Sequence, residues 1–371
     1  GDCSLTPPTG YKFVKDEATQ SYWVLKLDTS VDFTVTPGAN SKIAEVLVNG
    51  DDVTGSVPAK LEAGDIYKVT FEAENGYMIA AGAQTVFEGT AANAAITVTG
   101  PDAVLVVATV TDADGSAMGN YAALADAIAA ATNGCTVTLQ QDATLGKTSL
   151  SKSITLDLNS KTLTGAVGAS DKYLISLNLG YALTVKDGSI VAKTDATQVA
   201  FSEIFHVYAD LTVENVAIDA TGLTGTGYFG EGTAAVFGIM NGNVQITGST
   251  SVANVNKGYL LSVGNHAGAG KGYDSRNVTI NTTGTLDGDF FFAGGKVNYV
   301  AGDITGAKFY YGAARADTDD TKVDATTVFA ISDLTDFTLT TGVGEVPTAP
   351  ADEAKYLVNG QLYATVAYAE A

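Results

Sequence analysis

The sequence predicts an all-β protein with two unlike halves, and three observations lead to this prediction. Short segments that alternate apolar and polar residues, separated by turn residues, fill the first ~110 positions. From about residue 136 a repeat with a period of roughly 20 to 35 residues replaces that pattern. Helical spacing of apolar residues occurs in one segment, at 121–132. Strands therefore account for nearly all of the regular structure that we expect.

The first half, residues 1–110, is expected to form an antiparallel, immunoglobulin-like β-sandwich. Asn49-Gly50 and Asn75-Gly76 are typical of tight hairpin turns, because both residue types tolerate positive φ. Residues 10–27 are expected to form a separate hairpin, with Trp23 as the anchor of its core. The predicted strands are 22–27, 32–36, 43–48, 67–73, 95–99 and 104–110.

The second half, residues 111–344, contains six related blocks. Each has a three-residue aliphatic strand, a short polar turn, and a further aliphatic position seven to nine residues after the first. Successive blocks are offset by 29, 28, 33, 34 and 19 residues. Three short strands in each irregular period are typical of a parallel β-helix, whose coils bury aliphatic side chains only by stacking on one another. The blocks begin at Ile154, Leu183, Leu211, Val244, Val278 and Val297, and the apolar strands ahead of them are 173–177, 204–208, 235–240, 259–263 and 290–293.

The helical segment at 121–132 precedes the first coil. Its apolar residues Leu124, Ala127, Ile128 and Ala131 share one helix face, and Asn133-Gly134 follows as a stop signal. We expect this helix to cap the first coil, which would otherwise expose an apolar end. After the coils, residues 345–371 are expected to form a Pro-containing linker and a C-terminal strand segment.

Charge limits the classes of partner. The chain has 20 basic and 41 acidic residues, for a formal net charge of −21. Such a surface repels phosphate backbones and anionic lipid headgroups, so we expect no nucleic-acid partner. No apolar run approaches the ~18 residues of a membrane helix, so we expect no membrane insertion. Calcium, cationic groups and neutral sugars remain as ligand classes.

The chain has two cysteines, Cys3 and Cys135, 132 positions apart. This spacing fits neither a metal motif nor a small disulfide scaffold. A Cys3–Cys135 disulfide is one expectation if the protein is secreted, and two unpaired buried thiols are the other.

The run from the predicted cap into the first coils is similar to a known family. YAALADAIAA (121–130), NGCTVTL (133–139), SITLDLNSKTL (153–163) and ALTVKDGSI (182–190) resemble the opening of right-handed, pectin-lyase-like β-helices in large repetitive bacterial surface proteins. The resemblance covers roughly 121–306. It implies a right-handed β-helix at the cell surface or in the extracellular space, with like subunits, other surface proteins or glycans as partners. It does not imply one activity, because this fold hosts lyases, hydrolases, adhesins and assembly subunits.

Among enzymes that have the fold this chain resembles, the lyases use acidic residues that bind calcium, and an Arg or Lys acts as the base. The hydrolases use adjacent aspartates with His and Arg or Lys. Arg276 and Arg315 are the only arginines of this chain. We therefore expect a non-catalytic structural or adhesive protein that presents a rigid β-helix and assembles into an array or filament. The alternative is a carbohydrate-active β-helix, a polysaccharide lyase or glycoside hydrolase, that binds or cleaves an extracellular polysaccharide.

An acidic run, DTDDTKVD at 317–324, supplies the candidate metal ligands Asp317, Asp319, Asp320 and Asp324. Carboxylate oxygens are ligands that calcium prefers. We expect no other cofactor. A solvated acidic loop and a catalytic carboxylate pair are the two other interpretations of this run.

Aromatic residues gather towards the C-terminal coils, and strand alternation turns some of them outward. Outward rings stack on sugars or contact a partner, whereas inward rings fill the core. His266 lies in a glycine-rich loop, 264–274, that could overhang a groove. His206 lies opposite Phe205 and Val207, so we expect a surface histidine there rather than a general base. The candidate binding residues are Phe291, Tyr299, Tyr310, Tyr311 and His266.

Overall fold

The structure is a computed structural model, in which the chain divides into two compact units, residues 1–105 and 106–371. Within the described residues, α1 (Leu124–Ala130) is the single α-helix, η1 (Thr54–Ser56) is one 3-10 turn, and every other regular element is a strand. The chain is therefore all-β, as predicted. The described residues are 6–8, 11–26, 29–166, 173–192, 203–223, 234–253, 255, 258–263, 276–292, 296–304, 307–312, 325–330, 342–345, 356–358 and 361–363.

The first unit contains two sheets that share one core. Phe33 and Val98 of one sheet pack in the same cluster as Val46, Val69 and Phe71 of the other. The predicted Asn49-Gly50 turn is confirmed, because both residues have positive φ between β4 (Ser41–Val48) and β5 (Asp51–Asp52). One sheet has the order β10 (Ile96–Thr99), β3 (Val31–Thr36), β6 (Lys60–Leu61), and the other has β5 (Asp51–Asp52), β4 (Ser41–Val48), β7 (Ile66–Ala73), β9 (Val86–Thr90).

The pairing in this unit differs from the prediction in one place. β10 runs parallel to β3, with Ile96 opposite Phe33, whereas the prediction was wholly antiparallel. Parallel neighbours need a long crossover rather than a tight turn, and some 60 residues separate these two strands. The remaining strands of the unit, β8 (Tyr77–Ile79) and β11 (Ala103–Leu105), pair antiparallel.

The predicted N-terminal hairpin is present. β1 (Tyr11–Asp16) and β2 (Ser21–Lys26) pair antiparallel as a sheet of their own. The role expected of Trp23 is wrong, because its side chain is 61% exposed and belongs to neither core cluster of the described residues. A two-stranded ribbon has no second layer against which to bury a ring, so Trp23 anchors nothing within the hairpin.

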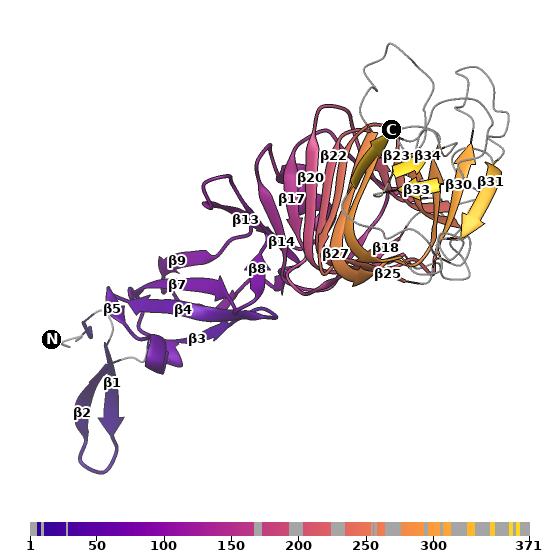
Figure 1. Ribbon diagram of the computed structural model, residues 1–371. Coiled ribbons are helices and arrows are strands. Elements are labelled where there is room, and N and C mark those ends of the chain that lie inside the picture. The colour runs from indigo at the N-terminus through magenta and orange to yellow at the C-terminus, as the bar shows by residue number, and fades with distance from the viewer. Residues whose placement is uncertain are drawn as a thin grey trace. The chain divides into compact units, whose positions relative to one another are not determined.

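The second unit contains two long sheets whose neighbouring strands are mostly parallel. Figure 1 shows β17 (Ile154–Asp157), β20 (Ala182–Ala192), β22 (Asp210–Asp219) and β27 (Arg276–Thr285) of a thirteen-stranded sheet running side by side. The thirteen-stranded sheet follows the order β13 (Ala117–Tyr121), β12 (Ala108–Thr111), β14 (Thr136–Leu139), β17 (Ile154–Asp157), β20 (Ala182–Ala192), β22 (Asp210–Asp219), β24 (Gly242–Gly248), β27 (Arg276–Thr285), β29 (Lys296–Asp303), β32 (Gly342–Glu345), with β15 (Ala143–Leu145), β18 (Thr162–Gly165) and β25 (Ser251–Ala253) beside it. The eight-stranded sheet follows β16 (Thr148–Leu150), β19 (Tyr173–Leu177), β21 (Glu203–Val207), β23 (Ala234–Ile239), β26 (Gly258–Val263), β28 (Asp289–Phe292), β30 (Lys308–Gly312), β31 (Ala325–Ala330).

The register of the thirteen-stranded sheet reproduces the sequence repeat. The first residues of all six predicted blocks lie opposite one another on consecutive strands, which confirms that each block stacks on the next. The apolar strands predicted ahead of the blocks form the second, eight-stranded sheet. The ladder of block starts runs Ile154, Leu183, Leu211, Val244, Val278, Val297.

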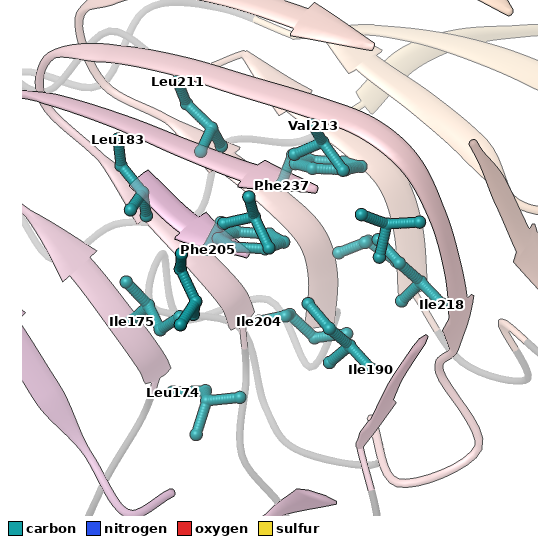
Figure 2. Close-up of a cluster of buried hydrophobic side chains, with 14 of the residues drawn as sticks. Leu174, Ile175, Leu183, Ile190, Ile204, Phe205, Leu211, Val213, Ile218 and Phe237 are labelled. Atoms are coloured by element: carbon teal, nitrogen blue, oxygen red, sulfur yellow. The ribbon is translucent and has the colours of Figure 1, made fainter. Parts of the chain in front are cut away.

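Both sheets contribute to one continuous hydrophobic core. In Figure 2, Phe205 and Phe237 of the eight-stranded sheet lie beside Val213 of the thirteen-stranded sheet. The two phenyl rings are stacked, with centroids 5.4 Å apart and planes within 8°. This offset pairing stabilises the contact by about 0.5–1.5 kcal/mol beyond the area that it buries.

The cap helix is shorter than the predicted 121–132. Tyr121 is the last residue of β13, where it pairs with Ala108, so α1 begins at Leu124. Leu124, Ala127 and Ile128 are buried in the core of the second unit, as the helical spacing predicts. The ammonium group of Lys152 donates hydrogen bonds of 2.7–3.0 Å to three carbonyl groups at the C-terminus of α1.

Strands of the chain itself lie at the ends of both sheets. In the thirteen-stranded sheet, β13 is the last strand at one end, where it pairs antiparallel with β12 and β12 pairs antiparallel with β14; at the other end β32 pairs antiparallel with β29. In the eight-stranded sheet, β31 pairs antiparallel with β30, and the opposite end is the three-residue strand β16. A further antiparallel pair, β33 (Tyr356–Val358) and β34 (Gln361–Tyr363), lies near the C-terminus of the chain.

Candidate functional site

A break in strand alternation creates the most chemically distinctive site of the described residues. In β21, both Ile204 and Phe205 are buried in the core, and the parallel ladder omits Ile204 between the pairs of Glu203 and Phe205. This extra inward residue acts as a β-bulge does. It places Glu203 and His206 on the same outer face, although strict alternation would separate residues three apart.

The neighbouring strands contain the same irregularity, so it is a property of the sheet. Each has two consecutive buried apolar residues where alternation would allow one, and the ladders through them also omit a residue. The feature therefore repeats over four stacked strands. The doublets are Leu174-Ile175 in β19, Val236-Phe237 in β23 and Leu260-Leu261 in β26.

Glu203 and His206 form a buried hydrogen-bonded contact on that outer face. The carboxylate Oε2 of Glu203 contacts Nδ1 of His206, and the two residues are 2% and 3% exposed. The other ring nitrogen, Nε2, lies 3.1 Å from the hydroxyl oxygen of Tyr208. A buried carboxylate is retained only where such partners compensate its lost hydration. We call Glu203, His206 and Tyr208 the Glu–His–Tyr cluster.

The arrangement defines which proton transfers the cluster could perform. When Nδ1 of His206 donates to Glu203, the neutral imidazole presents Nε2 as an acceptor for the Tyr208 hydroxyl. Glu203 then orients the ring and stabilises its positive charge, and His206 can take the phenolic proton. Tyr208 is the member of the cluster that is only partly buried.

Side chains from neighbouring segments form the walls of this site. The ring of Tyr173 stacks on His206 at 5.1 Å with an interplanar angle of 7°, and the Tyr208 ring meets His206 edge-on at 4.9 Å. The ammonium of Lys147 lies over the Tyr173 ring, 5.1 Å from its centroid. Lys147, just before β16, Tyr173 of β19 and His206 of β21 thus form one continuous stack.

Gly238 provides the space into which the Glu203 carboxylate fits. It pairs with His206 across β21 and β23. A Cβ atom added to Gly238 would lie within 3.0 Å of the Glu203 carboxyl group, closer than real Cβ contacts allow. The glycine is therefore a requirement of the site. Ser176 and Ser262, in the same row of the sheet, are also buried, so the outer face is covered on both sides of the cluster.

A second polar group lies in the middle of β20 in the thirteen-stranded sheet, where Asp187 has positive φ; we call this position the corner. Lys186 bridges Asp157 and Asp187, with Nζ to oxygen distances of 3.0 and 3.1 Å. These bonds raise the pKa of Lys186, with the Asp157 bond first in importance. The amide of Asn215 donates to Asp187 at 3.0 Å and is the largest cause that lowers the pKa of Asp187, followed by Lys186.

This corner has a conformational role. Asp187 and Asn215 both have positive φ, and so does Gly248 of β24, the next strand of the sheet. Short Asx side chains tolerate this region and can satisfy local backbone groups, which explains why Asn215 also accepts a bond from the amide of Ser249. The corner ladder is thus structural: Lys186 is shared by two aspartates, and the uncharged amide of Asn215 supplies a further donor to Asp187.

The aromatic binding candidates are only partly brought together. Phe291 and Tyr310 lie opposite each other on β28 and β30, whereas Tyr299 lies on β29 of the other sheet, opposite Ile280. Tyr311 pairs with Phe292, one position along from Phe291. The register therefore supports one adjacent pair, Phe291 and Tyr310. Whether these positions bind a partner stays a prediction.

The other predicted site residues lie outside the described residues, namely His266, Asp317, Asp319, Asp320, Asp324 and Cys3. Calcium binding at the acidic run therefore stays a prediction. Cys135 is buried, and its sulfur lies 3.2 Å from the amide nitrogen of Thr132 and 3.4 Å from the sulfur of Met118. Because Cys3 is not described, the Cys3–Cys135 disulfide also stays a prediction.

Sequence reasoning placed His206 on the correct face and drew the wrong conclusion from it. The ring does lie opposite Phe205 and Val207, but it is buried rather than at the surface. Glu203 and Tyr208 were missed altogether. The signal that could have found them is the apolar doublet Ile204-Phe205, since two inward residues in succession bring the flanking polar residues onto one face.

Other features of the described residues add no second site. A shallow depression of about 590 Å³ in the first unit is lined by Leu47, Ile66, Tyr67 and Glu88 among others. No group of three or more His, Cys, Asp or Glu side chains in the described ranges is arranged to hold a metal ion. No described helix combines the length and apolar character that crossing a membrane requires.

Comparison with known proteins gives no relative. No family model, no curated protein and no solved structure matches this chain.

Proposed function

We propose that the chain is a non-catalytic structural or adhesive protein of the extracellular space or cell surface. In this proposal the second unit is a right-handed parallel β-helix capped by α1, and the first unit is a β-sandwich. The observation that carries the proposal is the unbroken register of six repeat starts across β17, β20, β22, β24, β27 and β29. Segments about 30 residues apart that stack in register make a rigid body from a repeated, variable sequence.

The outer face of this stack supports a display role. Seven strands from β14 to β29 stand side by side, and six steps of ~4.8 Å give a face about 29 Å long. The row through Thr136, Thr155, Thr184 and Thr212 continues with the polar residues Gln245, Thr279 and Asn298. A face of this kind holds side chains at fixed spacing for contact with like subunits, other surface proteins or glycans.

A pair of matched substitutions tests the proposal. Ile246 is fully buried, whereas Ala217 of β22 is exposed and lies outside the row of polar residues just described, so Ile246→Asp disrupts the stack and Ala217→Asp leaves it intact. Bead-coupled full chain is applied to a glycan panel and to bacterial cell surfaces, and polysaccharides are incubated with catalytic amounts of the same protein.

We expect the wild type and Ala217→Asp to be retained on at least one surface and Ile246→Asp to lose retention. No sugar fragment should be released. Retention by Ile246→Asp equal to that of the wild type would contradict the display role. Turnover of any polysaccharide would contradict the non-catalytic assignment.

A carbohydrate-active protein is the second candidate, favoured by the Glu–His–Tyr cluster. A phenol whose proton is taken by an oriented imidazole is a general base of the kind that sugar-ring proton abstraction needs. Glu203→Gln and Tyr208→Phe keep the size of each side chain and remove the two ends of this proton path. If a polysaccharide is turned over, both variants should lose most of that activity while keeping the thermal stability needed for folding.

A further inference from the structure

Asn-Gly pairs are the places in this chain where the backbone can react with a neighbouring side chain. Glycine has no Cβ atom, so its amide nitrogen can approach the side-chain carbonyl of the asparagine before it. The last of these pairs lies outside the described residues, and the structure distinguishes the other four by how tightly each is held. The asparagines of the five pairs are Asn49, Asn75, Asn133, Asn241 and Asn359.

Asn75-Gly76 is the pair that has both reacting groups free within the described structure. Both residues are exposed, in the turn between β7 and β8. The amide of Tyr77 closes this turn by donating to the carbonyl of Glu74 at 3.0 Å, and Gly76 has a φ of +85°. Neither the Asn75 side chain nor the Gly76 amide forms a hydrogen bond with a described residue. The space around Gly76 is also open, since a Cβ atom placed there would have nothing within 4 Å beyond its chain neighbours.

Two of the other pairs are held by hydrogen bonds. The side-chain amide of Asn49 is fixed at both ends, because it donates to Asp65 at 2.8 Å and accepts from the backbone amide of Ile66 at 2.9 Å. At Asn133-Gly134 the asparagine oxygen accepts from the Ser153 amide, and the glycine amide donates to the Ser153 carbonyl, both at 2.8 Å. Reaction at either pair requires these bonds to break first.

The remaining described pair, Asn241-Gly242, is held by burial. Asn241 is 5% exposed, and its side-chain amide donates to the carbonyl of Tyr208 at 3.0 Å. A buried and bonded amide reaches a reactive conformation only when the structure opens locally. Asn75 is therefore the described asparagine of this kind that can react without any such opening.

We propose that Asn75 is a site of spontaneous deamidation. The amide nitrogen of Gly76 attacks Cγ of Asn75 while its proton passes to water or hydroxide, and Nδ2 is protonated and leaves as ammonia. The new C–N bond closes a succinimide ring. Water then adds to one of the ring carbonyls and opens the ring, which gives aspartate or, with the main chain rerouted through the side chain, isoaspartate. The net reaction consumes water and releases ammonia, and it does not depend on the proposed function.

The products change the charge and the main-chain length of the first unit. Either product adds a carboxylate next to Glu74, and isoaspartate also adds a methylene group to the main chain within the turn. β8 begins directly after this turn and pairs with β11, with Tyr77 opposite Leu105 and Ile79 opposite Ala103. We therefore expect the isoaspartate form to weaken this pairing, which faster hydrogen exchange of the β8 amides would reveal.

Incubation of the purified full chain in heavy-oxygen water tests the proposal. Native and urea-unfolded samples are digested, and mass spectrometry measures deamidation at each pair, with heavy-oxygen uptake marking reaction during the incubation. In the native chain Asn75 should react at least about tenfold faster than Asn49, Asn133 and Asn241, because those residues must first lose hydrogen bonds. In urea the rates should converge, since the sequence partners of all four asparagines are glycines.

Two variants test the two halves of the argument. Gly76→Ala adds a methyl group beside the attacking nitrogen and should slow the reaction at Asn75 several-fold, in urea as well as in the native chain. Asp65→Ala removes the acceptor of the Asn49 side-chain amide and should speed the reaction at Asn49 while leaving that at Asn75 unchanged. Unfolding midpoints in urea confirm that each variant is folded.

Three results would overturn the proposal. One is an Asn75 that stays intact in the native chain while it reacts in urea. Another is a set of equal native rates at the four described pairs, since the hydrogen bonds would then give no protection. The third is a Gly76→Ala chain that reacts at Asn75 as fast as the wild type, which would exclude attack by the backbone nitrogen at this position.

Discussion

Adding one methyl group at Gly238 tests how the Glu203 carboxylate is seated. Gly238→Ala places a Cβ atom within 3.0 Å of that carboxyl group, which is held by His206 and cannot retreat without breaking the contact. Overpacking of this kind destabilises by about 1–3 kcal/mol. In a unit of this size we expect the midpoint of thermal unfolding to fall by about 2–10 °C.

A double-mutant cycle identifies the cause of that loss. Glu203→Ala alone leaves His206 without its carboxylate and should destabilise by about 3–5 kcal/mol. In that background the alanine at position 238 meets vacated space, so its added effect should fall below about 0.5 kcal/mol. Gly146→Ala is the matched control, because its nearest atom would be at an ordinary contact distance of 3.5 Å.

Urea unfolding followed by circular dichroism gives these free energies. The transition of residues 1–105, where it is resolved, is an internal reference that none of the variants should move. The reasoning is refuted if Gly238→Ala is as stable as Gly146→Ala. It is also refuted if Gly238→Ala destabilises equally with and without Glu203, since the methyl group would then clash with something else.

Three further predictions concern the cap, the corner and its titration. Lys152→Met removes three charged hydrogen bonds at the end of α1 and should lower the unfolding free energy by about 1.5–3 kcal/mol, measured in urea; an unchanged midpoint would show that those bonds do not cap the helix. Asn215→Gly should destabilise less than Asn215→Ala, by about 1 kcal/mol, because φ is +56° at this position; equal midpoints would contradict the left-handed backbone there. The lowered pKa of Asp187 means that its contribution is present above the unfolded-state value of about 3.9 and is lost as pH falls through the lower folded-state pKa. The stability difference between wild type and Asp187→Asn should therefore shrink on acidification across that window, and a difference that stays constant with pH would argue against the shift.

The stacking register could be predicted from sequence because it depends on a local pattern repeated many times. Ile154, Leu183 and Leu211 each begin an aliphatic, polar, aliphatic run, and a parallel sheet aligns like with like since a slip of one residue would turn every aliphatic side chain outward. Irregular spacing did not obscure the pattern. The extra residues lie between blocks and do not change which residues begin a block.

The candidate site could not be predicted because it depends on exceptions to that pattern. Strict alternation assigns Ile204 and Phe205 to opposite faces, and only their burial on the same side brings Glu203 beside His206. The prediction that Trp23 anchors a core was wrong for a related reason. A large ring in an alternating strand predicts a core, but β1 and β2 have no second layer to supply one. In both cases the answer depends on a neighbouring layer that no short window of sequence contains.

The way the two long sheets end decides how copies of this chain can join. Extension of these sheets from one copy to the next would need open parallel edges. The antiparallel β13–β12 pair, β31 and β32 close three of the four ends by antiparallel pairing, and β16 at the fourth has three residues. Short or antiparallel ends are poor templates for extending a parallel sheet. Joining of copies by growth at a sheet edge is therefore disfavoured at all four ends.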